Sequence, residues 1–197
     1  MSLQPFVTAT AVADPLIRGA EDPTHAERRV TAQVSAHVVF GVLNEIEIEH
    51  VALSPVRAET FVGQVTWLPP ALARDDDKVP QYLRHRAPHR LLNAYVAGRA
   101  AQLLEAFGWP GATFALGYAA PETECILALA ELISPHDPWP VIRHHIADVS
   151  FVIQNEIVAQ SIRLVAGHLN VQRRLTGNDA TNLVTSALAS SKLRSAR

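Results

Sequence analysis

The chain has 197 residues, of which 48% are hydrophobic and 18% are charged, and its formal net charge is -2. This length and apolar content predict one globular domain with a substantial core. The near-neutral charge argues against a nucleic-acid-binding protein, and no basic amphipathic segment suggests a membrane surface. One cysteine, Cys125, excludes an internal disulfide framework and is typical of a reducing compartment. Because residues 1–15 also lack a signal-peptide pattern, we expect a cytoplasmic protein.

The first half of the chain predicts an arm, a central helix and a hairpin. Residues 1–23 are small and polar with no clear period, so we expect an N-terminal arm that is loose or docks on the domain. Thr24 and Glu27 have the spacing of a capping box, and the segment that follows is apolar almost all round. We therefore predict a buried helix that ends near Leu43. Two strand-like segments after this helix predict a small β-hairpin that packs on it, at residues 46–53 and 59–68.

Two details of the predicted hairpin come from single residues. The alternation of apolar and polar side chains slips at His50, which predicts a bulge or a strand start there. Ser54 and Pro55 begin a segment of turn-forming residues that extends to Ala58. We expect this segment to connect the two strands.

The second half of the chain predicts helices only. Apolar residues recur at helical spacing in three segments, and we expect a break near Asp148 in the last of them: residues 89–107, 122–133 and 141–170. Thr176, with Asp179 three residues later, predicts the start of a short final helix that ends near Leu188. Residues 189–197 are polar and basic and predict a disordered tail. The fold class is therefore mainly α (α+β), with one domain over residues 24–188.

The central helix carries one unusual polar feature. Gln33 and His37 are four residues apart, which places both side chains on the same face of a helix. Zinc hydrolases place two histidine ligands at this spacing, with a catalytic glutamate directly after the first histidine. Here the first position is Gln33 and the glutamate position is Val34. The pair is therefore either the remnant of a metal site or an ordinary buried polar contact.

Four other features of the sequence can be considered together with the Gln33–His37 pair. Residues 31–55 place the Gln33–His37 helix directly before a strand that ends in Ser54-Pro55. Residues 96–104 contain the run Gly-Arg-Ala-Ala within a helix, and residues 124–130 begin with a glutamate followed by apolar residues. Residues 175–180 contain a Leu-Thr-Gly turn before the last helix. Taken in order, residues 27–186 resemble the proteolytic domain of the FtsH-type AAA+ zinc metallopeptidases.

The resemblance implies a helical peptidase-like domain whose hairpin packs on the equivalent of the zinc-binding helix. By the same correspondence, His37 matches the second zinc ligand, and Glu124 stands where the family has an aspartate ligand. Gln33 and Val34 replace the first histidine ligand and the catalytic base. An amide oxygen is a poor zinc ligand compared with imidazole, and valine cannot accept a proton. We therefore expect a vestigial site without bound zinc, no peptidase activity, and a role as a binding or regulatory module for a protein or peptide.

Two alternatives stay open at this point. The first is a variant zinc-dependent hydrolase that binds metal through His37, Glu124 and another residue such as His50 or His136. The second is a structural helical subunit of a homo-oligomer. If Gln33 and His37 are buried together, we expect them to bond to each other or to buried water, because an unpaired buried polar group costs about 1–3 kcal/mol.

The remaining histidines predict no further site. His85 and His89 are separated by Pro88, which argues against a regular helix, and the neighbouring arginines would repel a cation. His144 and His145 are adjacent in the sequence and so point to different faces of a helix. We expect both of these pairs to lie on the surface.

Overall fold

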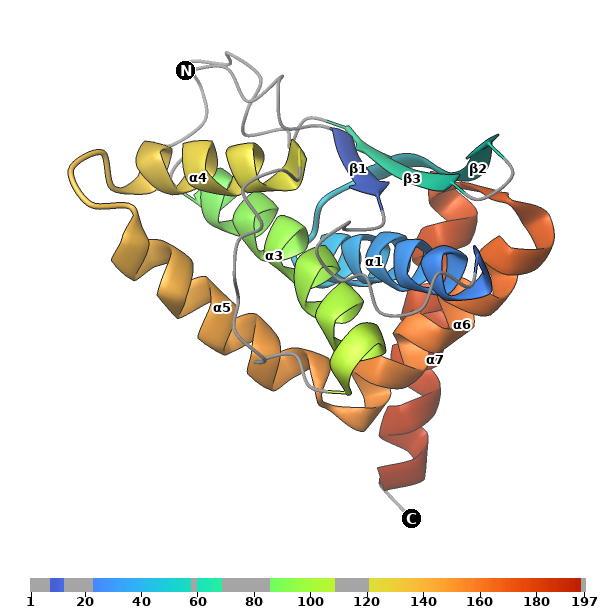
Figure 1. Cartoon of the computed structure of the whole chain (residues 1–197). Helices are drawn as coiled ribbons and strands as arrows, with labels where there is room; N and C mark the ends of the chain where they lie inside the picture. The colour runs from blue at the N-terminus through green and yellow to red at the C-terminus, as the bar shows by residue number, and fades with distance from the viewer. Residues whose placement is uncertain (1–7, 13–22, 58–59, 69–85, 109–120, 196–197) are drawn as a thin grey trace.

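The computed structural model describes residues 8–12, 23–57, 60–68, 86–108 and 121–195. Within these residues the fold is mainly helical, with one small antiparallel sheet, as Figure 1 shows. This confirms the predicted α+β class. None of the described helices is long and apolar enough to cross a membrane.

Helix α1 (Pro23–Leu43) lies at the centre of the fold, with the sheet on one side and other helices around it (Figure 1). It contacts helix α3 (Arg86–Phe107), helix α6 (Glu156–Gln172) and the sheet. Residues Val30, Val34 and Val38 of α1 are fully buried. A helix that is apolar on nearly all sides can be buried in this way because few of its side chains need a polar partner. The predicted central helix is confirmed.

The sheet has four strands in the order β1-β3-β2-β4, all antiparallel. The strands are β1 (Thr8–Val12), β2 (Ile48–Arg57), β3 (Thr60–Trp67) and β4 (Arg174–Thr176). The predicted hairpin is therefore present as β2 and β3, and the expected irregularity at His50 is a register shift next to Ile48. The prediction of a hairpin alone was wrong, because segments distant in the sequence add a strand on each side.

Strand β1 shows that residues 8–12 of the N-terminal arm dock on the domain, whereas residues 1–7 and 13–22 lie outside the described residues. Residues 8–12 pair with β3, and Ala9 and Ala11 are buried on α1. The expected turn over residues 54–58 was wrong, because β2 continues to Arg57 and Pro55 pairs with Phe61. Proline is tolerated here because β4 pairs with β2 only between residues 50 and 52.

The helices confirm most of the predicted segments, but the start of α3 and the break in the long predicted helix differ from the prediction. Helix α3 begins at Arg86, so Pro88 lies in its first turn, where its missing N–H leaves no helical bond unmade. The long predicted helix is divided into α5 (Trp139–Ile153) and α6, and the break lies at Asn155 rather than Asp148. The Asn155 side chain caps α6 by accepting a hydrogen bond from the Ile157 N–H at 3.0 Å. Helix α4 (Pro121–Ile133) is as predicted.

Helix α7 (Gly177–Ser195) starts where the capping pattern predicted it. The Asp179 N–H lies 3.2 Å from the Thr176 hydroxyl oxygen, and this hydroxyl lies 2.7 Å from the Asp179 carboxylate. The predicted end at Leu188 and the disordered tail were wrong for residues 189–195, which continue the helix outward from the body of the fold (Figure 1). The alanine, lysine, leucine and arginine residues of this segment are good helix formers even without packing.

Gly98 and Gly167 provide a matched pair for testing the packing of α3 on α1. Both lie inside helices, but a Cβ on Gly98 would lie 2.1 Å from Cε1 of His37, whereas one on Gly167 would meet nothing within 4 Å. We expect Gly98→Ala to lower the free energy of unfolding by about 1–3 kcal/mol. Gly167→Ala should raise it by about 0.5–1 kcal/mol, because alanine favours the helix. Urea unfolding measures both values, and similar effects of the two substitutions would contradict this packing.

Candidate functional site

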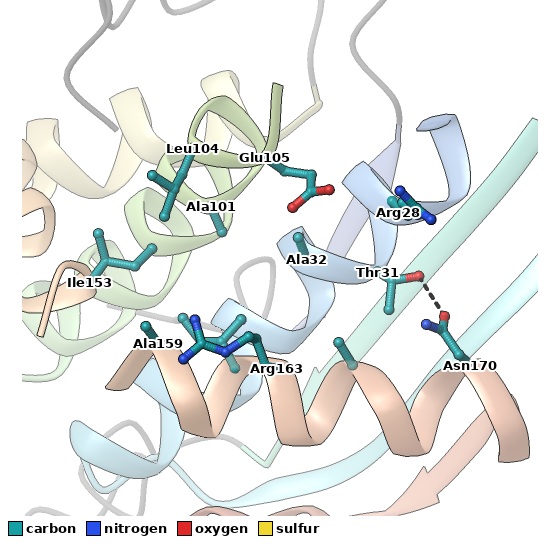
Figure 2. Close-up of a pocket in the computed structure, with 12 residues that line it drawn as sticks. Arg28, Thr31, Ala32, Ala101, Leu104, Glu105, Ile153, Ala159, Arg163 and Asn170 are labelled. Atoms are coloured by element: carbon teal, nitrogen blue, oxygen red, sulfur yellow. Dashed lines mark hydrogen bonds between the residues drawn. The ribbon is translucent and has the colours of Figure 1, made fainter. Parts of the chain in front are cut away.

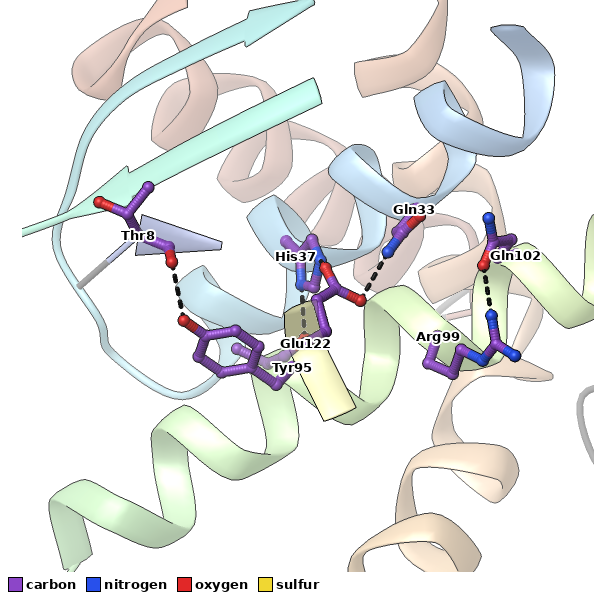
Figure 3. Close-up of polar contacts among 8 residues, drawn as sticks. Thr8, Gln33, His37, Tyr95, Arg99, Gln102 and Glu122 are labelled. Atoms are coloured by element: carbon purple, nitrogen blue, oxygen red, sulfur yellow. Dashed lines mark hydrogen bonds and ion pairs between the residues drawn. The ribbon is translucent and has the colours of Figure 1, made fainter. Parts of the chain in front are cut away.

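The candidate site is a buried cluster in which Gln33 and His37 of α1 both contact Glu122 of α4 (Figure 3). The Gln33 Nε2 lies 2.5 Å from Glu122 Oε2, and the His37 Nε2 lies 2.6 Å from Glu122 Oε1. The exposed fractions of the three residues are 3%, 0% and 3%, in the order Gln33, His37 and Glu122. One carboxyl group therefore joins two side chains that are one helical turn apart.

The partners of His37 fix the position of one ring proton. Its Nδ1 lies 2.8 Å from the carbonyl oxygen of Ala94, which can only accept, so Nδ1 carries a hydrogen. One further hydrogen lies between Nε2 and Glu122 Oε1, either as an imidazolium–carboxylate pair or as a neutral imidazole accepting from a carboxylic acid. Gln33 donates to the second carboxyl oxygen. The carboxyl group is therefore hydrogen-bonded through both of its oxygens.

Aromatic rings and a glycine surround His37. The rings of Trp67 and Tyr95 meet the imidazole edge-on, with centroid distances of 5.9 and 6.0 Å. The Tyr95 hydroxyl donates to the carbonyl oxygen of Thr8 at 2.8 Å, which ties α3 to β1 (Figure 3). Burial raises the pKa of Tyr95 above its usual range, so the phenol stays a neutral donor. Gly98 lets the α3 backbone approach the imidazole closely.

The expected third residue of the site, Glu124, does not belong to this cluster. Glu124 is exposed, whereas Glu122, which the sequence analysis missed, is buried against His37. Two positions along a helix are separated by a rotation of about 200°, so Glu122 and Glu124 point to nearly opposite faces. The sequence offered two glutamates in the first turn of α4, and only the rotation of α4 about its axis decides which one faces α1.

Val34, which occupies the general-base position of the resemblance, faces the sheet. It is fully buried, and a Cβ on Gly63 of β3 would lie 2.0 Å from the Val34 Cγ2. Position 34 is therefore a packing position against β3, on a different face of α1 from Gln33 and His37. A glutamate at this position would have to bury its carboxylate against the strand.

The residues of the cluster do not fit a zinc ion. Zinc at about 2.0–2.1 Å from each ligand holds two tetrahedral ligand atoms about 3.3 Å apart. The His37 Nε2 and Glu122 Oε1 are only 2.6 Å apart, which is a hydrogen-bonding distance. Gln33 turns its amide N–H, which cannot bind a metal ion, toward the carboxyl group. In the part of the chain that the structure describes, no three histidine, cysteine, aspartate or glutamate residues are grouped so as to hold a metal ion.

The additional ligands of the variant-hydrolase alternative lie elsewhere. His50 is exposed on β2, and its Nε2 lies 3.3 Å from the Thr66 hydroxyl. His136 is exposed in the connector before α5. Neither residue is brought to His37, and Glu124 points to solvent. The combination of His37, Glu124 and either histidine is therefore not assembled.

A second polar chain, buried only at His145, links α5, α3 and the end of α1. The His89 Nδ1 lies 2.9 Å from the His145 Nε2, and the His145 Nδ1 lies 2.6 Å from the Asn93 side-chain oxygen. Asn93 then donates to the Asn44 side-chain oxygen at 3.1 Å, and Asn44 donates to the Phe40 carbonyl oxygen at 2.7 Å. Each group has a matching donor or acceptor when His145 is neutral. The chain is a structural connection between three helices.

The surface placement of two histidines was wrong in part. His145 is 4% exposed, whereas His144 lies on the outer face of α5, 3.2 Å from the Asp148 carboxylate. His89 is in the first turn of α3, and its expected partner His85 lies outside the described residues. Adjacent residues on a helix do point to different faces, and here one of the two faces is buried against α3.

Comparisons with protein-family models, with curated proteins and with solved structures found no match to this chain. The likeness to FtsH-type metallopeptidases therefore rests on the sequence motifs alone.

The cluster predicts a clear difference between two substitutions of Glu122. In Glu122→Gln, the new amide can donate to His37 Nε2 and accept from Gln33, so the loss in the free energy of unfolding should stay within about 1 kcal/mol. Glu122→Ala leaves both partners buried and unpaired and should cost about 3 kcal/mol or more. Urea unfolding measures both, with Glu124→Ala as the exposed control. Equal costs for the two Glu122 variants would contradict the hydrogen-bonding pattern described.

His145 predicts a pH dependence of stability. Burial, followed by the nearby His89 and His144, lowers the pKa of His145 from 6.5 to about 4, and Asp148 opposes this shift. Between these two values the unfolded chain binds more protons than the folded chain, so stability should fall as the pH is lowered from 6.5 to about 4. His145→Gln should reduce this slope in urea unfolding measured across the same pH range. A slope that is unchanged in this variant, and altered instead by the control His168→Gln, would contradict the assignment.

Proposed function

We propose that this chain is a metallopeptidase-like domain without peptidase chemistry, which acts as a binding or regulatory module in the cytoplasm. The observation that carries the proposal is the bridge from Glu122 to both Gln33 and His37. In this arrangement Gln33 and His37, which stand at the positions of two metal ligands, are hydrogen-bonded to the same carboxyl group. The cluster then joins α4 to α1, and both oxygens of its carboxyl group are engaged in these hydrogen bonds.

The chemistry of peptide hydrolysis supports the same proposal. A zinc peptidase needs a metal-bound water and a carboxylate that accepts its proton. The resemblance places the carboxylate at position 34, where the chain has a valine packed against β3. Loss of a general base costs about 10²–10⁴ in rate even where the metal is kept. The described residues next to Gln33 and His37 offer no replacement base, because Glu122 is already bonded through both oxygens.

The packing around the cluster is consistent with the proposed descent from a peptidase domain. The Gly-Arg-Ala-Ala run of the resemblance lies on α3, and its glycine, Gly98, contacts the imidazole of His37. The strand that follows the helix in the resemblance is β2, which pairs with β3 against α1. These contacts explain why the motifs would be retained after the loss of catalysis, since they maintain the core.

Zinc binding by the purified protein tests the proposal. We expect far less than one zinc per chain by elemental analysis, no change in the melting temperature on adding zinc, and no zinc-dependent cleavage of fluorogenic peptides. Glu122→Gln is the matched variant, because it should fold and lacks the carboxylate. Near-stoichiometric zinc that stabilises the wild-type chain but not Glu122→Gln would overturn the proposal and favour a metal-dependent hydrolase.

A further inference from the structure

A groove lies between α1, α3, α6 and the end of α5. It has a volume of about 330 Å³, and its floor is made of apolar side chains including Ala32, Ala101 and Ile162. One turn of α1, one turn of α3 and the length of α6 form its walls, as Figure 2 shows. Pockets of this size and lining are typical of small-molecule sites.

The charges at the rim of this groove are of both signs. Arg28 stands on the α1 wall and Glu105 on the α3 wall, and both are exposed. Within the described part of the chain, neither side chain has a hydrogen-bonding or ion-pair partner. A third charged residue of the rim, Arg163, is already paired with Glu156 at 2.7 Å. The groove therefore presents one unpaired cation and one unpaired anion on facing walls above an apolar floor.

We propose that this groove binds a small zwitterion with an apolar body, of the chemical class of free apolar amino acids. The ligand carboxylate would contact Arg28, the ammonium group would contact Glu105, and the side chain would cover the apolar floor. A simple fatty acid would leave Glu105 facing an apolar chain or a carboxylate. An aliphatic amine would leave Arg28 facing an apolar chain or an ammonium group. Only a molecule with both charges matches both walls.

The dimensions of the groove favour a small ligand over a helix of a partner protein. Its contact with α1 extends only from Arg28 to Ala32, and its contact with α3 only from Ala101 to Glu105. A partner helix needs anchors over two or more turns on each wall. Thr31 and Asn170, whose side-chain oxygens are 3.3 Å apart, add neutral polar groups at the same end as Arg28 (Figure 2).

The test is a titration of the full chain with L-leucine, followed by chemical-shift changes in NMR spectra. We expect saturable binding that Arg28→Gln and Glu105→Gln each weaken by about fivefold. N-acetyl-leucine lacks the ammonium group, so its weaker binding should not change in Glu105→Gln. Leucine amide lacks the carboxylate, so its binding should not change in Arg28→Gln.

Matched controls separate binding in the groove from general effects of charge. Arg143→Gln on α5 and Glu131→Gln on α4 remove exposed charges outside the groove and should leave leucine binding unchanged. Ala166→Phe places a large side chain in the groove and should abolish binding. Urea unfolding of each variant shows whether it remains folded, and circular dichroism gives a second check.

Three results would overturn the inference: no saturable leucine binding, equal binding of octanoate and leucine, or insensitivity of leucine binding to both Arg28→Gln and Glu105→Gln. Leucine-type binding in the groove would supply the ligand of the proposed binding role, so this inference rests on the proposed function. The two can still fail separately, because zinc analysis tests the Glu122 cluster and leucine titration tests the groove. Leucine binding by a chain that also holds stoichiometric zinc would support the groove and overturn the proposed function.

Discussion

A carboxyl group inside the protein sets the main constraint on this fold. Glu122 is buried at the start of α4, and a buried carboxyl group is costly unless its oxygens are bonded. Gln33 and His37 supply these bonds from α1, and the carbonyl oxygen of Ala94 orients the imidazole from α3. Three helices are therefore held by one polar cluster, and Gly98 provides the space that the imidazole requires.

The elements with a strong local pattern could be predicted from the sequence. The central helix follows from its apolar character, and the start of α7 follows from the spacing of Thr176 and Asp179. Strands β1 and β4 could not be predicted in this way, because they are short and are stabilised by pairing with β3 and β2, which are distant in the sequence. The extent of α7 was missed because composition alone does not separate an exposed helix from a disordered tail.

The site could be predicted only in part, for a related reason. Gln33 and His37 share a helix, so their spacing is enough to place them together. Glu122 comes from another helix, and its choice over Glu124 depends on how α4 is rotated against α1, which local periodicity does not determine. The same reason explains the burial of His145, whose face of α5 is covered by α3. A resemblance gives the order of such segments but not the rotation of each helix.

The most direct test of this account is NMR of the His37 imidazole nitrogens, measured in the same sample before and after zinc is added. We expect an Nδ1 proton that exchanges slowly with water, because it is bonded to the Ala94 carbonyl oxygen, and an Nε2 signal typical of a hydrogen-bonded imidazole. Neither signal should change when zinc is added. A shift of the Nε2 signal to that of a metal-bound nitrogen would show that zinc displaces the Glu122 contact, and it would contradict the account.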